Sequence, residues 1–253
     1  MAGFGTRTEL RTGMDRLGPM ICVASYNIRR GLGTDWRRDL ERNVAVLREI
    51  DADVVAVQEA DPIFGDLFER VSPATVTAES HYVPVRLGAT RNDIAWQGNV
   101  VLVRQSATVV ATQCVNLPSF EEQRGAAIVD LTIGGLPVRV VAMHLGLIGL
   151  WRTRQALAVL DRINALETRL PTVMLGDLNE WRPRSACIDH FARTHHIASP
   201  GRSFPSRLPL FALDKIMIDE SFHLVSAGVH DSPLARIASD HLPVWARLTP
   251  TQA

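Results

Sequence analysis

An apolar run leads directly into two polar residues in the segment 172–179, which reads TVMLGDLN. The letters VML predict a buried strand, and Gly176 allows the backbone to turn where that strand ends. Asp177 and Asn179 then alternate outward at the C-terminal edge, which is where open α/β sheets place their sites. Together with a second polar pair, Asp240 and His241, this carboxylate and carboxamide indicate a hydrolase.

Other predicted strands also end in residues that could do chemistry. The polar residues at strand ends are Asn27, Glu59, Asn99, His144, Asp177, Asn179, Asp214, Asp240 and His241. Each alone has a plainer explanation, since an asparagine after a strand is often a turn former and a lone histidine is often a hydrogen-bonded core residue. Carboxylates, imidazoles and amides converging on one edge would be costly to desolvate without a metal ion or a substrate. The set as a whole therefore predicts one shared site.

The elements that position these residues follow from apolar periodicity. A strand–helix–strand pattern opens the chain, antiparallel strands fill its middle, and a second strand–helix–strand unit follows. The expected strands are 21–28, 53–57, 99–104, 107–115, 125–133, 138–145, the TVMLGDLN segment, 213–218, 223–228 and 244–248, and the expected helices are 40–50, 151–170 and 185–193. Gly134 and Gly135 predict a hairpin turn, and Pro171 is expected to end the long helix, whose apolar face contains Leu166 and Leu170.

Length and composition are those of one enzyme-sized unit. With 253 residues, 46% of them hydrophobic, we expect a single domain over residues 21–250, preceded by a disordered tail at 1–20. Lysine plus arginine and aspartate plus glutamate both number 27, so there is no global basic field to capture nucleic acid, which leaves only a local patch.

The cysteines and the apolar segments bear on the cellular compartment in which the protein is expected. Cys22, Cys114 and Cys187 form neither a zinc motif nor an even disulfide framework, which favours buried free thiols in a reducing environment. The chain has no secretory h-region and no apolar run of roughly 18 residues that would cross a bilayer. We therefore expect a soluble, cytoplasmic monomer.

Seven short motifs occur in order: SYNI at 25–28, VQE at 57–59, GN at 98–99, MHL at 143–145, GDLN at 176–179, LDKI at 213–216 and SDHLP at 239–243. In these the chain resembles the endonuclease/exonuclease/phosphatase superfamily of metal-dependent phosphoesterases, over about residues 21–248. The resemblance implies an α/β (α+β) fold of the deoxyribonuclease-I-like kind. This is a four-layer α/β/β/α sandwich of two mixed sheets flanked by helices, with Mg²⁺ or Mn²⁺ bound at the sheet ends.

The resemblance also implies roles for the residues at the strand ends. Its metal ligands correspond to Asn27, Glu59 and Asp240, and such hard oxygen ligands suit magnesium, which takes one or two carboxylates from a protein. Its catalytic residues correspond to His144, Asp177, Asn179, Asp214 and His241.

Asp177 and His241 would align and deprotonate the attacking water, with the choice of base left open, and Asp214 would hold the imidazole of His241. Asn179 would donate to a phosphate oxygen. His144, protonated or hydrogen-bonded through Asn99, would neutralise charge that grows on the phosphoryl group.

The expected activity is Mg²⁺- or Mn²⁺-dependent hydrolysis of a phosphodiester, with a lipid headgroup or a small organic phosphodiester favoured and DNA as the alternative. The chain has a single lysine, Lys215, where a nuclease would need basic residues along its cleft. Two apolar segments, 145–151 and 206–213, adjoin predicted site residues and favour an amphiphilic substrate and peripheral membrane contact, although both could simply pack under helices. A catalytically inactive binding module is disfavoured, because the metal and acid–base residues are all present.

These two segments and the run NIRRGLGTDWRRDL also resemble a bacterial branch of small phosphodiesterases, related to proteins encoded near phospholipid-synthesis enzymes. The resemblance adds to the case for a lipid-derived substrate.

Overall fold

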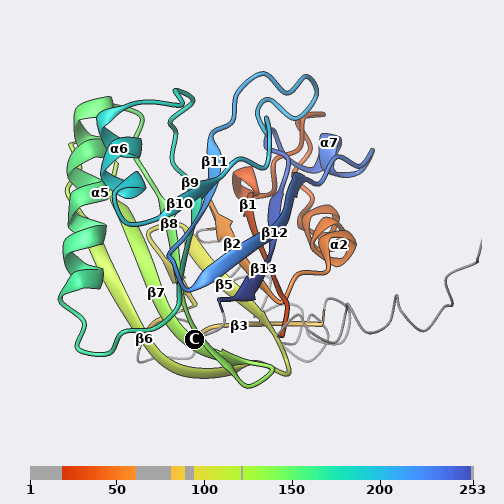
Figure 1. The fold of residues 1–253 in the computed structure, drawn as a ribbon. Coiled ribbons are helices and arrows are strands. Elements are labelled where there is room, and N and C mark those ends of the chain that lie inside the picture. The colour runs from red at the N-terminus through yellow and green to blue at the C-terminus, as the bar shows by residue number, and fades with distance from the viewer. Residues whose placement is uncertain (1–18, 61–80, 89–93, 121, 252–253) are drawn as a thin grey trace, which may run out of the picture.

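The computed structural model describes residues 19–60, 81–88, 94–120 and 122–251. Two β-sheets pack face to face in this part of the chain, and helices cover their outer faces (Figure 1). The predicted tail at 1–20 lies outside the described residues except for Pro19 and Met20. The four-layer α/β/β/α sandwich expected from the sequence is confirmed.

The first sheet has the strand order β12-β13-β1-β2-β5-β3, with β4 paired to β5. Its strands are β1 (Ile21–Asn27), β2 (Val54–Gln58), β3 (Tyr82–Pro84), β4 (Ala95–Trp96), β5 (Asn99–Arg104), β12 (Phe222–Val229) and β13 (Val244–Pro250). Its outer face is covered by α2 (Leu40–Ile50) and α7 (Ala235–Ala238), and a short 3-10 helix, η1 (Arg29–Gly31), follows β1.

The second sheet has the order β10-β11-β9-β8-β7-β6. Its strands are β6 (Thr108–Leu117), β7 (Arg124–Ile133), β8 (Leu136–His144), β9 (Thr172–Asp177), β10 (His196–Ala198) and β11 (Asp214–Ile218). The helices α5 (Gly149–Asn164) and α6 (Ala186–Ala192) pack on its outer face.

Each sheet contains one parallel pair whose strands are joined by a helix. β1 and β2 are parallel and are connected through α2, and β8 and β9 are parallel and are connected through α5, while the other pairs are antiparallel. In a parallel pair the carboxyl ends of both strands reach the same edge of the sheet. The two predicted strand–helix–strand units are thus confirmed, and each delivers two strand ends to one end of the sandwich.

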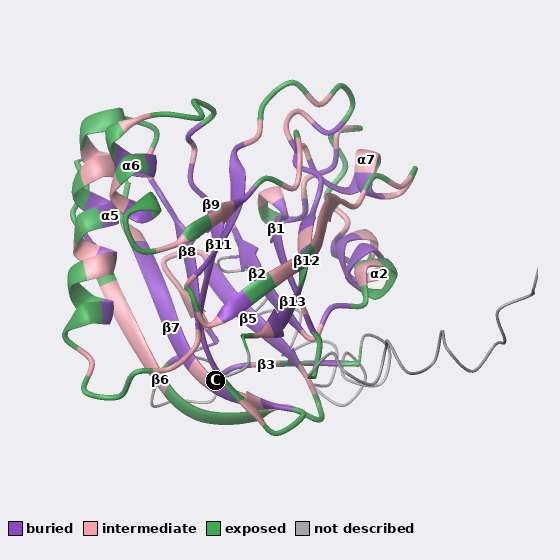
Figure 2. Ribbon diagram, in the orientation of Figure 1, coloured by how far each residue is buried: buried purple, intermediate pink, exposed green. Residues whose placement is uncertain are grey.

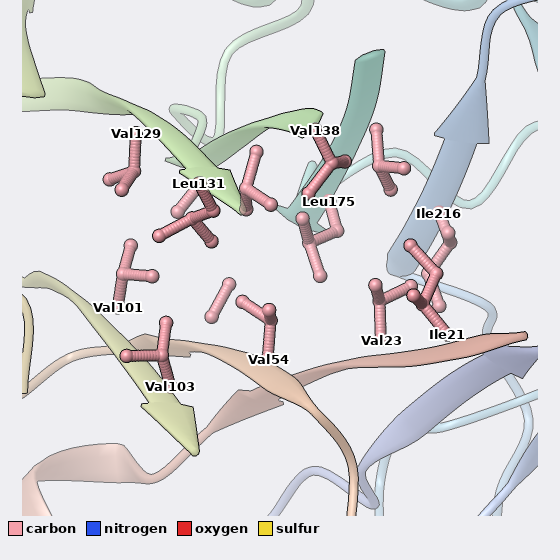
Figure 3. Packing of buried hydrophobic residues seen from close by; sticks show 14 of the residues in the cluster. Ile21, Val23, Val54, Val101, Val103, Val129, Leu131, Val138, Leu175 and Ile216 are labelled. Atoms are coloured by element: carbon pink, nitrogen blue, oxygen red, sulfur yellow. The ribbon is translucent and has the colours of Figure 1, made fainter. Parts of the chain in front are cut away.

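The main hydrophobic core lies between the sheets. Alternate residues of facing strands point into it, among them Val23 and Val54 from the first sheet and Leu131 and Leu175 from the second (Figure 3). Because a strand turns successive side chains to opposite faces, the strand residues between these contact the outer helices instead. Both faces of the central strands are therefore buried, which explains their almost continuous apolar sequences.

Two expectations about local structure were wrong. The helix predicted at 151–170 is α5, which ends at Asn164, so Leu166 and Leu170 lie beyond it and Pro171 does not terminate it. The connection to β9 is held by Arg139, whose guanidinium donates to the Thr168 carbonyl while its backbone N–H donates to the Pro171 carbonyl. These two bonds hold the non-helical connection between α5 and β9, where the apolar spacing alone predicted a further helical turn.

Gly176 does not make a turn but lies inside β9, which continues to Asp177. Its φ is +154°, and a Cβ placed on it would lie 1.8 Å from the carbonyl oxygen of Met143 in the adjacent strand β8. Only glycine lets the two backbones approach this closely.

We predict that Gly176→Ala lowers the free energy of unfolding by more than about 3 kcal/mol, since the new methyl group forces β8 and β9 apart. The matched control is Gly149→Ala at the start of α5, where the nearest atom to a new Cβ is a side-chain nitrogen at 3.6 Å. Urea denaturation of both variants measures the difference, and equal stabilities would contradict the close-approach explanation.

Candidate active site

The carboxylate of Asp177 is the centre of the site. It is 1% exposed at the end of β9. Its Oδ2 accepts a hydrogen bond from Nδ2 of Asn27 at 3.0 Å, and its Oδ1 accepts one from the backbone N–H of Asn179 at 2.8 Å. The Nε2 atoms of His144 and His241 lie 3.6 and 3.7 Å from Oδ2. Four residues that the sequence placed at strand ends are thus brought together around a fifth.

His241 is held from the side opposite Asp177 by Asp214. The Nδ1 atom of His241 lies 3.0 Å from Oδ2 of Asp214, which also accepts a hydrogen bond from the hydroxyl of Ser203. The ring of Phe204 packs on the imidazole with 4.8 Å between centroids. The imidazole is therefore fixed between two carboxylates, with Nδ1 directed at Asp214 and Nε2 directed at Asp177.

These contacts set the charge of the pair. Burial by itself lowers the pKa of His241, but the carboxylates of Asp214 and Asp177 outweigh burial and raise that pKa to about 10. For Asp177, burial acts to raise the pKa, but the positive charge of His241 prevails and the pKa is lowered. Burial raises the pKa of Asp214. At neutral pH the arrangement therefore favours an imidazolium at His241 beside an ionised Asp177.

His144 has a different environment. Burial, reinforced by the guanidinium of Arg124, lowers its pKa to about 4, so the ring is neutral at pH 7. An Nη1 atom of Arg124 lies 2.8 Å from Nδ1 of His144, and Nδ2 of Asn179 lies 3.2 Å from its Nε2. A protonated His144 was one of the two expectations from the sequence, and the structure does not support it.

The other expectation, that Asn99 hydrogen-bonds to His144, was also wrong. The amide of Asn99 donates to the backbone carbonyls of Trp96, Gln97 and Gly125 instead. Asn99 thereby ties β5 to the start of β7 and has a structural role.

The residues expected to bind a metal form a looser group. Nδ2 of Asn27 lies 3.2 Å from Oε1 of Glu59, while Oδ2 of Asp240 forms an ion pair with Arg29 at 3.3 Å. Glu59 follows β2 with a φ of +54° and is partly exposed, so its carboxylate oxygens remain accessible. Hard oxygens with room for water around them fit Mg²⁺ or Mn²⁺.

Among the described residues, one group of acidic and histidine side chains is close enough to share an ion: Asp177, Asp214 and His241, whose ligand atoms lie within 4.8 Å of one another. A ring held as an imidazolium does not ligate a metal. The hydrogen bond from His241 to Asp214 and the raised pKa of the ring therefore favour a proton relay there, and leave Glu59 as the carboxylate best suited to a cation.

Comparison with known proteins identifies the kind of site. The model of the Endonuclease/Exonuclease/phosphatase family matches residues 24–241. The chain belongs to this family. A curated relative, the Uncharacterized protein YbhP of Escherichia coli strain K12, is 26% identical over 248 residues, which cover 89% of this chain and 95% of YbhP.

Solved structures of the family share the fold. The Bacteroides thetaiotaomicron mannosyl-6-phosphatase Bt3783 superposes with a TM-score of 0.70 at 19% identity, covering 90% of this chain and 99% of that protein. D. rerio TDP2, complexed with a single strand DNA product, superposes with a TM-score of 0.67 at 16% identity, covering 90% and 98%. At these identities the likeness shows the fold alone.

Membership of the endonuclease/exonuclease/phosphatase family means that the chain is a hydrolase of phosphoesters, in a family that generally uses a divalent metal. In the described part of the chain, none of the helices combines the length and the apolar character required to span a membrane.

Three residues of this phosphoesterase site were missed by reasoning from the sequence. Arg124 contacts His144, Ser203 contacts Asp214, and Arg29 pairs with Asp240. Arg124 begins β7, which runs antiparallel to β8 and so brings its N-terminal end to the edge where β8 ends. Examining the first residue of each antiparallel strand, as well as the last, would have found it.

We predict that the His241 ring remains protonated at pH 8 in metal-free protein and titrates with a midpoint near 10. The substitution Asp214→Asn should move the midpoint downward, because it removes the largest charge that favours the imidazolium. Histidine NMR in the presence of EDTA measures both values, with the signal assigned from a His241→Gln spectrum. A wild-type midpoint in the ordinary range near 6.5 would contradict the charge assignment.

Proposed function

We propose that this protein is a Mg²⁺- or Mn²⁺-dependent phosphodiesterase that hydrolyses a lipid headgroup or a small organic phosphodiester by in-line attack of water. The observation that carries the proposal is the buried carboxylate of Asp177, whose Oδ2 lies 3.7 Å from Nε2 of His241, while Nδ1 of that ring lies 3.0 Å from Oδ2 of Asp214. The lowered pKa of Asp177 and the raised pKa of His241 support an ionised carboxylate beside an imidazolium. A general base and a fixed cation side by side are what attack on a charged phosphoryl group requires.

Within this proposal Asp177 is the base. The lowered pKa of Asp177 keeps its carboxylate ionised, so that it can accept a proton from water. The pKa of His241, raised to about 10, keeps that ring protonated at neutral pH, so the ring cannot accept another proton. His241 instead places positive charge near the phosphoryl oxygens, and Asp214 fixes its orientation through Nδ1. The sequence left the choice of base open, and the proposal gives that role to Asp177.

Asn179 and Arg124 supply further donors. Asn179 has a φ of +51°, which turns its amide back toward His144, and Arg124 reaches the same ring from β7. Donors fixed before the substrate arrives stabilise developing charge without a reorganisation cost. Glu59, with Asn27 and Asp240, would hold the divalent cation, which when bound would supply Lewis-acid stabilisation of charge on the substrate.

DNA is the second candidate substrate, and one observation favours it. Five connections at the site end of the sandwich, at 29–38, 118–120 with 122–124, 145–154, 180–184 and 202–213, contain eleven arginines and three acidic residues in their described parts, although the chain as a whole is neutral. This local basic rim could bind phosphates of many kinds, including a nucleic acid backbone.

We predict that Asp177→Asn lowers turnover of bis-nitrophenyl phosphate by roughly 10²- to 10⁴-fold, the usual contribution of a general base. The assay compares this diester with nitrophenyl phosphate, phospholipids and plasmid DNA in the presence of Mg²⁺. Asp161→Asn on the exposed surface of α5 is the control and should retain activity. Cleavage of plasmid alone, with steep salt dependence, would favour the nuclease alternative, and unchanged turnover by Asp177→Asn would overturn the mechanism.

We further predict that EDTA abolishes activity, that Mg²⁺ or Mn²⁺ restores it, and that Glu59→Gln raises the Mg²⁺ concentration required for half-maximal rate by about tenfold or more. The neutral amide removes the charge that binds the ion, and loss of a close ligand interaction commonly costs this much in affinity. Glu167→Gln, exposed after α5, is the matched control. An unshifted Mg²⁺ dependence in Glu59→Gln would place the ion elsewhere.

A further inference from the structure

Large apolar side chains are exposed beside the active site in the segment 145–151, the first apolar loop. This loop directly follows His144, and its Leu147 is 69% exposed, with Ile148 and Leu150 also exposed. Phe120, 76% exposed at the start of the neighbouring β6–β7 connection, stacks on Trp151 with 6.3 Å between ring centroids. Leu145 packs in the core beneath α5, but the side chains of Leu147, Ile148 and Leu150 do not.

Polar contacts hold the first apolar loop in this exposed position. The guanidinium of the buried Arg152 donates to the carbonyls of Gly146 and Leu147 and forms an ion pair with Glu180 at 3.0 Å. The amide of Gln155 accepts from the Gly146 N–H and donates to the carbonyl of Pro118. Arg152 and Gln155 thus fix the backbone of the loop and keep its apolar side chains in solvent. This exposure costs free energy that would be recovered if the side chains packed inward.

A second apolar loop, residues 206–213, lies on the other side of the site. Leu208 is 66% exposed, and Leu210 and Phe211 are exposed beside it. Phe211 contacts the exposed Trp181 with ring centroids 6.2 Å apart, and Trp181 follows Glu180, the partner of Arg152. The exposed apolar side chains therefore form an arc from the first loop to the second.

The second apolar loop is anchored to the catalytic segment itself. The Ser206 backbone N–H donates to the Asp240 carbonyl, and the Ser206 hydroxyl donates to the carbonyl of Ser239. In Figure 1 the segment after β9 and the loop before β11 lie at the same end of the sandwich, and Figure 2 shows exposed residues along these connections. A surface that engaged this arc would lie directly against the entrance to the site.

Arginines accompany the apolar side chains. Guanidinium groups lie over three tryptophans at the site end of the sandwich, of which Trp151 belongs to the first apolar loop: Arg29 over Trp36 at 5.0 Å, Arg154 over Trp151 at 4.8 Å and Arg182 over Trp181 at 5.6 Å. Tryptophan and arginine together suit the boundary between lipid headgroups and acyl chains, where an apolar ring and a positive charge are both satisfied.

We propose that the two apolar loops and their arginines form a docking surface for a membrane containing anionic phospholipid, and that the substrate is a phosphodiester of that surface. The proposal deepens the proposed function and rests on it. Aliphatic side chains distinguish a membrane from DNA here, since Leu147, Leu150 and Leu208 can enter an acyl layer but cannot stack on bases as aromatic rings do. The excess of arginine complements anionic headgroups.

The test is sedimentation with vesicles of phosphatidylcholine, with and without phosphatidylglycerol, in the presence of EDTA so that binding is separate from turnover. Wild-type protein should bind the anionic vesicles. The double variant Leu147→Glu/Leu150→Glu should lose at least about tenfold in affinity, because each leucine contributes roughly that factor when buried. Val110→Glu on β6 is the matched control, since Val110 is 67% exposed but lies toward the opposite end of the strand from the site.

Each result has one meaning for the membrane proposal. Binding that depends on phosphatidylglycerol and is lost in the double variant but not in Val110→Glu supports it. Absence of vesicle binding by the wild type overturns it, and so does a loss of vesicle binding in Val110→Glu equal to that in the double variant. A double variant that binds vesicles normally but no longer nicks plasmid also overturns it. Turnover of bis-nitrophenyl phosphate is measured in parallel. A wild-type protein that turns over this diester but does not bind vesicles overturns the membrane proposal alone, whereas absence of turnover in the wild type contradicts the proposed function.

Discussion

A buried carboxylate at Asp177 is the constraint on which the rest of the site depends. An ionised group that is 1% exposed must be surrounded by donors and positive charge, or it neutralises. Asn27 comes from the first sheet, His144 from the second, and His241 from the connection between α7 and β13. The hydrogen-bond donors and positive charge around Asp177 therefore come together only when the two sheets pack correctly at this end. Correct packing of the sandwich and formation of the site are thus coupled.

The backbone around this carboxylate is strained in several places. Arg29, Glu59 and Asn179 all have positive φ, each at a cost of order 1–3 kcal/mol for a residue other than glycine. All three follow the ends of strands that reach the site edge, and the strands themselves are fixed by a dry core. The core thus holds strained connections that place Glu59, Asn179 and Arg29 at the edge of the sandwich where Asp177 lies.

The features that could be predicted from the sequence arise from local patterns, and those that could not be predicted arise from contacts between distant segments. The strand Asn99–Arg104 and the helix Leu40–Ile50 were predicted to the residue. A strand buried on both faces leaves a continuous apolar run, and a helix buried on one face leaves apolar residues at helical spacing, so the two patterns are easily told apart. The motifs found the residues around Asp177. The end of α5 and the close approach at Gly176 depend on neighbours distant in sequence, which leave no local pattern. The contact from Arg124 to His144 depends on the antiparallel pairing of β7 with β8, although the position of Arg124 at the start of a strand is a local signal.

Composition proved least informative about charge, because it does not record where the charged residues lie. The acidic residues of the site, Glu59, Asp177 and Asp214, are buried or half-buried, whereas arginines dominate the loops around them. A neutral chain can therefore present a basic rim around an acidic centre. Under the proposed function, such an arrangement would attract a phosphodiester at the rim and would leave the acidic groups free to bind a cation and accept a proton. The side chains that accompany these arginines are leucine, isoleucine and tryptophan, and in the first apolar loop the buried Arg152 and Gln155 hold the backbone that exposes them. This combination of apolar and basic side chains is what supports the membrane proposal.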